Sequence, residues 1–234
     1  WDGAKPATAK HSYLQRKQIQ PYSLRVDEEN RLIVPVMIDG KLSSLQFIPT
    51  DGQNKKFLPG GAVKGGSYTL GDPTEATTIL ISEGFATGAS VHEATGLPVV
   101  IAFSAPNLLS VGQSLRQQYP TATIVIAGDN DFHQDGKPNT GLLAATAAAD
   151  AIGGIVAVPE VMNNDKTDWN DVHVQHGLDA VRNAIDAART REKRPTMKGK
   201  TVLDDVYDFL GRFISYPSDH GHVAHCLWCA HSHL

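Results

Sequence analysis

Residues 123–131, TIVIAGDND, join an apolar run to two aspartates that are separated by one asparagine. Residues two apart in an extended segment point the same way, so Asp129 and Asp131 can reach one common site. Two carboxylates this close repel each other unless a cation or a proton compensates the charge. The pair indicates a metal site or, alternatively, a polar turn after a strand, where Asp and Asn are favoured.

A carboxylate at the end of a second apolar run favours the metal interpretation. Residues 77–83, TTILISE, end in Glu83, and ligands of open parallel sheets bind at the carboxyl ends of the strands. If the strands before Glu83 and Asp129 are neighbours, three carboxylates converge on one edge. Asp168 and Asp171, in TDWNDVH, follow a later apolar run, in a loop that could fold back over the same edge. Such hard oxygen ligands suit Mg²⁺ or Mn²⁺ and phosphoryl or nucleotidyl transfer.

Lysines near glycine-rich or acidic segments are candidate contacts to phosphates of nucleic acid or nucleotide. They are Lys55, Lys56 and Lys64, within the glycine-rich residues 54–71, and Lys166, beside the TDWND segment. The alternatives are a solvated hairpin tip for the first three and an ordinary surface lysine for the fourth.

Two further sets of residues could have either a functional or a purely structural role. Asn107 could reach the sheet edge, although capping of the following helix is the role we expect. The C-terminal His222, His225, Cys226 and Cys229 have short spacings and are soft ligands that suit zinc. On a helix they spread over more than one face, and the isolated C-x-x-C lacks a second pair, so a structural helix is the alternative.

The elements that must position these side chains fall into four zones. Residues 1–75 show a short helical pattern and alternating strands with turn signals, which predicts a small, mainly antiparallel β subdomain. In residues 76–178 apolar runs alternate with helical patterns, which predicts an α/β fold with a parallel sheet flanked by helices. Residues 179–200 are expected to be a helix and charged linker, and residues 201–234 two helices broken at Pro217 that begin a following domain.

Composition sets broad limits. The chain has 234 residues, of which 41% are hydrophobic, enough for a substantial core. Its net charge of −4 and its two cysteines indicate neither a general basic field nor a disulfide framework, although a local basic groove stays compatible with this charge. We find no signal peptide and no apolar run that could span a bilayer, so we expect a cytoplasmic protein without a membrane partner.

Phrases from the second zone resemble the Toprim (topoisomerase–primase) domain, whose pattern is E-G after the first strand and D-x-D after the third. They are ILISEGFATGASVHEATG, IVIAGDND and KTDWNDVH. The longer EGFATGASVHEATGLPVVIAFSAPNL is similar to the version in phage- and plasmid-type DNA primases and primase–helicases. In the first zone, HSYLQRKQI, LIVPV, LQFIPTDGQNKKFLPGG and SYTLG resemble the subdomain that precedes Toprim in those proteins.

The resemblance implies that Glu83, Asp129 and Asp131 are catalytic and hold Mg²⁺ or Mn²⁺, with Asp171 or Asp168 as an auxiliary acid. The implied activity is that of a DNA primase, which makes RNA primers on a single-stranded DNA template from nucleoside triphosphates. Residues 214–233 resemble the start of a helicase-associated domain, so a replicative helicase is a further expected partner.

Two alternatives stay open beside this interpretation. The same acids could support metal-dependent strand cleavage, or the chain could be a catalytically silent module that binds nucleic acid or recruits a helicase. Topoisomerase activity would need a separate tyrosine-bearing domain, and no segment here fits that role. Primases of this kind usually carry an N-terminal zinc-binding module, which this sequence lacks, so we expect the chain to prime poorly by itself.

Overall fold

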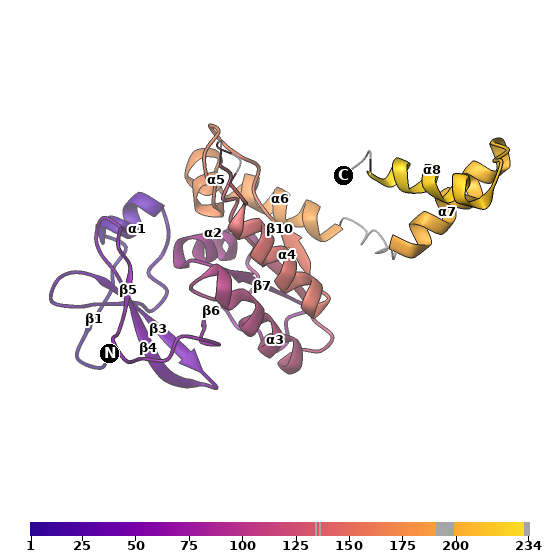
Figure 1. Ribbon diagram of the computed structural model, residues 1–234. Coiled ribbons are helices and arrows are strands. Elements are labelled where there is room, and N and C mark those ends of the chain that lie inside the picture. The colour runs from indigo at the N-terminus through magenta and orange to yellow at the C-terminus, as the bar shows by residue number, and fades with distance from the viewer. Residues whose placement is uncertain (134, 136, 191–198, 232–234) are drawn as a thin grey trace. The chain divides into compact units, whose positions relative to one another are not determined.

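The fold is described from a computed structural model, which covers residues 1–133, 135, 137–190 and 199–231. The chain divides into two compact units, residues 1–190 and 191–234, and each is described by itself. The first unit contains two five-stranded sheets, and the second contains a pair of helices (Figure 1). In the described residues no helix is both long enough and apolar enough to cross a bilayer.

The first sheet is antiparallel throughout, in the order β1-β2-β3-β4-β5. At its centre is the β3–β4 hairpin, where Asp39 and Gly40 both have positive φ (49° and 73°), as a tight two-residue turn requires. The expected small antiparallel β unit is therefore present. Its strands are β1 Lys5–Pro6, β2 Arg25–Val26, β3 Leu32–Ile38, β4 Lys41–Ile48 and β5 Lys56–Phe57.

A short helix, α1 Ser12–Lys17, contributes Tyr13 and Leu14 to the core of this sheet. The helix ends earlier than its apolar pattern because Gln18 adopts a left-handed backbone with φ of 55°. The same core includes Phe85 and Phe103, which belong to the segments around the second sheet. The two sheets of the first unit are thus joined by shared apolar packing.

The second sheet has the order β10-β9-β7-β8-β6. Four of its strands are parallel, as the sequence predicts, and β6 adds an antiparallel edge strand that the sequence pattern did not reveal. An antiparallel edge on an otherwise parallel sheet is common in α/β folds. The strands are β6 Tyr68–Leu70, β7 Thr78–Ser82, β8 Val99–Ile101, β9 Thr123–Ala127 and β10 Ile155–Ala157.

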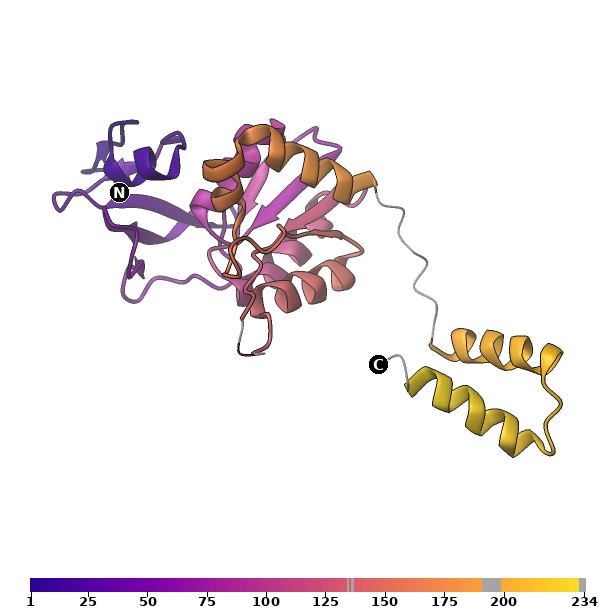
Figure 2. The same cartoon turned by 90° about the horizontal axis from the view of Figure 1, so that it is seen from above.

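Helices cover both faces of the second sheet (Figure 2). Alternate residues of a strand point to opposite faces, so Ile79 and Ile81 pack with one helical layer and Leu80 packs with the other. The layer around Ile79 contains η1 Ala105–Asn107, α3 Leu108–Gln118 and α4 Thr140–Ile152. The layer around Leu80 contains α2 Phe85–Thr95, α5 Trp169–His176 and α6 Leu178–Thr190.

The segment TDWNDVH is helical rather than a loop, which corrects our expectation. Asp168 is the N-cap of α5, and its carboxylate accepts a hydrogen bond from the Asp171 amide at 2.8 Å. The Asp171 carboxylate accepts a reciprocal bond from the Asp168 amide at 2.9 Å. This capping box satisfies two amide groups that a helix start leaves free, so the acidic spacing starts a helix here.

The second unit consists of α7 Gly199–Phe213 and α8 Asp219–His231, one on each side of Pro217. An aromatic stack connects them, since the His222 ring lies 3.6 Å from the Tyr207 ring and 4.2 Å from the Tyr216 ring, centroid to centroid. Residues 191–198 of the expected charged linker lie outside the described residues.

Candidate metal centre

Two of the expected acids leave the second sheet side by side. Strands β7 and β9 pair directly in parallel, with Ser82 opposite Ala127. Glu83 follows the first of these residues, and Asp129 follows the second after a single glycine. The condition for convergence of the carboxylates, that their strands are neighbours, is therefore met.

Glu83 and Asp129 lie in an environment that disfavours their negative charges. Burial raises the pKa of Glu83 to about 7, and the charge of Asp131 adds to this effect, while the backbone amides of Asp129 and Ala105 oppose it. Burial also raises the pKa of Asp129 to about 8, with further contributions from Glu83, Asp168 and Asp131. The Oε1 atom of Glu83 is buried and has no hydrogen-bond partner. The Lys55 ammonium lowers the pKa of Asp129, but burial and the neighbouring carboxylates outweigh it on this side of the cluster.

Asp131 is held quite differently. Burial alone would raise its pKa, but its carboxylate accepts bonds from the Thr140 hydroxyl at 2.7 Å and the Gly141 amide at 2.9 Å, at the start of α4. Lys166 adds an ion pair, with Nζ 3.5 Å from Oδ1. These contacts lower the pKa of Asp131 overall, so it stays ionised beside its two more basic neighbours.

Glycine is required where α4 approaches this cluster. A Cβ atom at Gly141 would lie 2.5 Å from the carbonyl oxygen of Asp129, which is too close for any side chain. The close approach places the amide of Gly141 within reach of the Asp131 carboxylate.

Of the two expected auxiliary acids, Asp168 is the one that acts on the cluster. Its charge raises the pKa of Asp129, and its own pKa is raised by burial and by Asp171. Asp171 belongs to the capping box of α5, its carboxylate lies 4.0 Å from the ammonium of Lys17, and its side chain is 43% exposed. The metal role that we predicted for Asp171 is therefore better assigned, as a prediction, to Asp168.

The predicted lysines divide into two pairs. Lys166 contacts Asp131, and Lys55 lies close enough to Asp168 and Asp129 for their charges to act on its ammonium. The pKa of Lys55 is nevertheless lowered, first because its ammonium is crowded by protein and second because Lys17 is near, although the residue as a whole is exposed. Lys56 and Lys64 are exposed and, within the described residues, form no ion pair with these acids.

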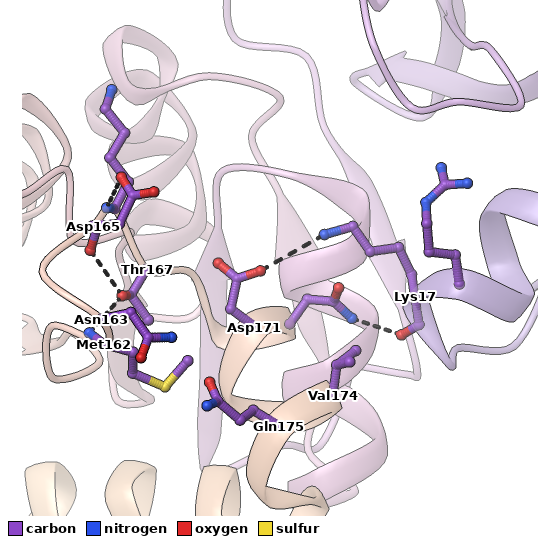
Figure 3. A pocket seen from close by; sticks show the side chains of 11 residues that line it. Lys17, Met162, Asn163, Asp165, Thr167, Asp171, Val174 and Gln175 are labelled. Carbon is purple, nitrogen blue, oxygen red and sulfur yellow. Dashed lines mark hydrogen bonds and ion pairs between the residues drawn. The ribbon is translucent and has the colours of Figure 1, made fainter.

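A pocket of about 440 Å³ opens beside the acids, between α1, α5 and the segment 162–167 (Figure 3). Figure 3 shows Lys17 reaching from α1 toward Asp171 across this pocket. Lys166 belongs both to the pocket wall and to the ion pair with Asp131, so the pocket adjoins the acidic cluster. Our sequence analysis missed Arg16 and Lys17, whose only signal is the basic last turn of α1.

Across residues 1–133, 135, 137–190 and 199–231, no three His, Cys, Asp or Glu side chains form a ready-made metal cage. This includes the C-terminal residues considered for zinc, which lie on or beside the structural helix α8: His222, His225, Cys226 and Cys229. For the acidic cluster, the donor chemistry is nonetheless suitable, because Mg²⁺ is usually bound through one or two carboxylates, its own waters and substrate phosphates. The unpartnered Oε1 of Glu83 is an oxygen that such an ion would satisfy.

Comparison with known proteins places this geometry in context. The family described as the Toprim domain matches residues 78–179. Two Escherichia coli proteins, both named DNA primase TraC, are 36% and 33% identical to this chain over 155 and 162 residues. The alignments cover 63% and 66% of this chain but only 11% and 15% of those proteins, so the chain corresponds to a small part of each.

Among the matching solved structures is one whose similarity supports the same fold. It is that of bacteriophage T7 lagging-strand DNA polymerase interacting with primase domains of two gp4 subunits bound to an RNA/DNA hybrid and dTTP. The matching chain has a TM-score of 0.55 and 16% identity, with 76% of this chain and 92% of that chain covered.

Proposed function

Residues 78–179 are a Toprim domain, and from this premise we propose that the chain is the catalytic core of a plasmid- or phage-type DNA primase. Its reaction is the template-directed joining of ribonucleotides into an RNA primer on single-stranded DNA. The observation that carries the proposal is the buried pair of carboxylates at the ends of β7 and β9, Glu83 and Asp129, with Asp131 ionised beside them.

The residues that would hold Mg²⁺ or Mn²⁺ are Glu83, Asp129 and Asp131, with Asp168 as the auxiliary acid. When bound, the metal would favour the ionised form of the primer 3′-hydroxyl and neutralise the charge of the pyrophosphate leaving group. The fit rests on three features of the cluster: all donors are carboxylate oxygens, one of them is buried without a partner, and two pKa values are raised by burial and by the neighbouring carboxylates.

The other groups at the site would bind and orient the substrates. Lys166 can exchange its long contact with Asp131 for a phosphate oxygen, and Lys55, directly before β5, lies near Asp129 and Asp168. Arg16 and Lys17 extend this positive charge along the adjoining pocket. Phosphate contacts from lysine and arginine supply most of the affinity for a nucleic-acid backbone without specifying its sequence.

The comparisons support nucleotides and a DNA template as the substrates. Two relatives are named DNA primases, and the solved structure with the same fold contains primase domains with an RNA/DNA hybrid and dTTP. A replicative helicase remains part of the proposal as a partner, through the second unit, on the resemblance of residues 214–233 alone.

The test is extension of a labelled primer on a single-stranded template with nucleoside triphosphates and Mg²⁺ or Mn²⁺. A preformed primer separates extension from the initiation step. We expect extension by the unmodified chain and loss of at least 100-fold in Asp129→Ala. Asp150→Asn, an exposed carboxylate on α4 outside the cluster, is the matched control and should extend normally.

The same assay separates the alternatives. Shortening of the labelled strand in Mn²⁺ without nucleotides, lost in Asp129→Ala, would replace the primase proposal with strand cleavage. Template binding without extension or shortening under either metal would replace it with a silent binding module.

A further inference from the structure

One loop of the second sheet reaches into the core of the first. The loop between β8 and α3, residues 102–107, carries Phe103, whose side chain is only 8% exposed and packs in the first-sheet core. The Phe103 ring meets the ring of Phe57 on β5 edge-on, with 5.8 Å between centroids. Phe103 has a left-handed backbone with φ of 69°, which is unfavourable for a bulky residue, so its packing must hold the loop in this form.

The same loop also touches the acidic centre. The backbone amide of Ala105, in η1, stabilises the charged form of the Glu83 carboxylate. Residues 102–107 therefore contact both Glu83 of the acidic centre and the part of the first sheet around β5, which carries Lys56.

Asn107 completes this connection, and it does not act as the helix cap that we expected. Its side chain is 5% exposed and makes no capping bond to α3. Instead Oδ1 accepts a bond from the Gly65 amide at 2.7 Å, and Nδ2 donates to the carbonyls of Gly66 at 2.9 Å and Ala102 at 2.8 Å. The side chain thus holds the segment 63–66, which carries Lys64, against the end of β8.

Segment 63–66 is fixed on its other side to the first sheet. Ser67 and Met37 of β3 exchange two backbone hydrogen bonds, both of 2.9 Å. Gly66 packs so closely on Val36 that an added Cβ would lie 2.4 Å from its Cγ1. The Asn107 bonds that hold Gly66 against the second sheet therefore also hold β3 against that sheet.

The first sheet has a second attachment on the side of α1. The amide of Gln20 and the hydroxyl of Tyr22 both donate to Glu93 on α2, at 2.8 Å and 3.0 Å, and Asn170 of α5 donates to the Lys17 carbonyl at 2.7 Å. Loss of the Asn107 contacts would leave this attachment in place. Because the apolar core shared with Phe85 and Phe103 also remains, we expect wider movement of segment 63–66 and the first sheet rather than release of that sheet.

We infer that Asn107 is a positioning residue that fixes Lys64 and the first sheet relative to the acidic centre for nucleotide joining. The inference rests on the proposed function for its catalytic consequence, but its structural part can be tested separately. Asn107 itself touches no substrate in this scheme and acts through the segment that carries Lys64.

The structural test uses pulsed electron paramagnetic resonance. It measures the distance between one spin label on the first sheet and another on a helix that covers the second sheet. Labels at the exposed positions Lys41→Cys, at the tip of the β3–β4 hairpin, and Gln117→Cys, on α3, report on the two parts. Both native cysteines are changed to serine. We expect Asn107→Ala to broaden the distance distribution at least twofold relative to the parent protein.

The matched control is Arg116→Ala. Arg116 also holds several backbone carbonyls, among them Ile152 at 2.9 Å and Ala122 at 2.7 Å, but all within the second sheet and its helices. It should cost stability without broadening the distribution. Asn107→Asp keeps the bond from Gly65 but sets a buried carboxylate oxygen against the carbonyl oxygens of Gly66 and Ala102, so it provides a second variant that should broaden the distribution at least as much as Asn107→Ala.

The functional test is the primer-extension assay at varied template concentration. We expect Asn107→Ala to raise the half-saturating template concentration about tenfold, with a smaller change in kcat and unchanged Mn²⁺ binding. Adding Lys64→Ala to it should produce no further loss, because the two residues act as one unit. An unbroadened distribution in both Asn107 variants overturns the inference. Absence of extension by the parent protein instead overturns only the proposed function, since the distance measurement does not depend on it.

Discussion

The acidic centre has two sides that shift the pKa values of their carboxylates in opposite directions. At the ends of β7 and β9, Glu83 and Asp129 are buried beside other carboxylates, and the Lys55 charge near Asp129 does not offset this, so their pKa values rise to about 7 and 8. At the start of α4, Asp131 has a hydroxyl, a backbone amide and a lysine, and its pKa falls. From this difference we propose that a metal cation would change the ionisation of Glu83 and Asp129 far more than that of Asp131.

The largest expected effect is on the side of Glu83 and Asp129, where activity and stability should move in opposite directions. Glu83→Gln should reduce primer extension at least 100-fold, yet raise the free energy of unfolding of the metal-free protein by about 1 kcal/mol, because it removes an uncompensated charge. Asp131→Asn should instead lower that free energy by about 1 kcal/mol, since it weakens charge-assisted bonds. Chemical denaturation in a chelator measures both, and the same sign for the two variants would contradict the comparison.

The pH dependence of stability follows from the same contrast. Because the folded pKa values of Glu83 and Asp129 are raised, the folded protein binds more protons than the unfolded chain between about pH 4 and pH 8. Their contribution is therefore complete at acidic pH and is lost as pH rises through 7 to 8. The melting temperature of the metal-free protein should fall over this range, and saturating Mg²⁺ should flatten the fall. An identical fall in Glu83→Gln would show that other groups cause it.

A smaller effect is expected for the lysine on the side of Asp131. Lys166→Ala should change the free energy of unfolding by less than about 0.5 kcal/mol, because its ion pair is long and 54% of the lysine side chain is exposed. It should nevertheless reduce primer extension about tenfold, through loss of a phosphate contact. Lys137→Ala, which breaks a shorter exposed pair of 2.6 Å with Asp135, is the matched control and should leave extension unchanged.

The smallest effect separates the two residues of the α5 capping box. Asp171→Ala should lower the free energy of unfolding by about 1 kcal/mol and leave primer extension within twofold of the parent protein. Asp168→Ala should cost similar stability and in addition reduce extension clearly, because only Asp168 acts on Asp129. Equal extension in the two variants would remove Asp168 from the centre.

The sequence predicted the parts of the centre that depend on strand patterning. Apolar runs that alternate with helical patterns predicted the parallel sheet. Because ligands of such sheets bind at the carboxyl ends of the strands, Glu83 was then expected near Asp129, and their strands do pair. It did not reveal that TDWNDVH starts a helix, because an acidic D-x-x-D spacing is typical of loops as well as of caps. That spacing is decisive only with the reciprocal bonds of Asp168 and Asp171 in view.

Contacts between distant segments could not be predicted at all. Lys17 and Asp171 line the same pocket although more than 150 residues separate them in the sequence. No local sequence pattern predicts this contact. Asn107 shows the same limit, since its place before a helix predicts a cap while its actual partners lie about 40 residues earlier. The misassignment arose because capping is a local rule and the competing bonds are tertiary.

The insertion of Phe103 into the first-sheet core has a consequence for how the protein folds. The N-terminal strands cannot complete their interior until the polypeptide has been made past β8, because the rings of Phe85 and Phe103 are part of it. We therefore expect residues 1–75 to be unstable as a separate piece and both sheets to melt in one cooperative transition. Exchange of this N-terminal segment between homologous proteins would have to carry the β8–α3 loop with it.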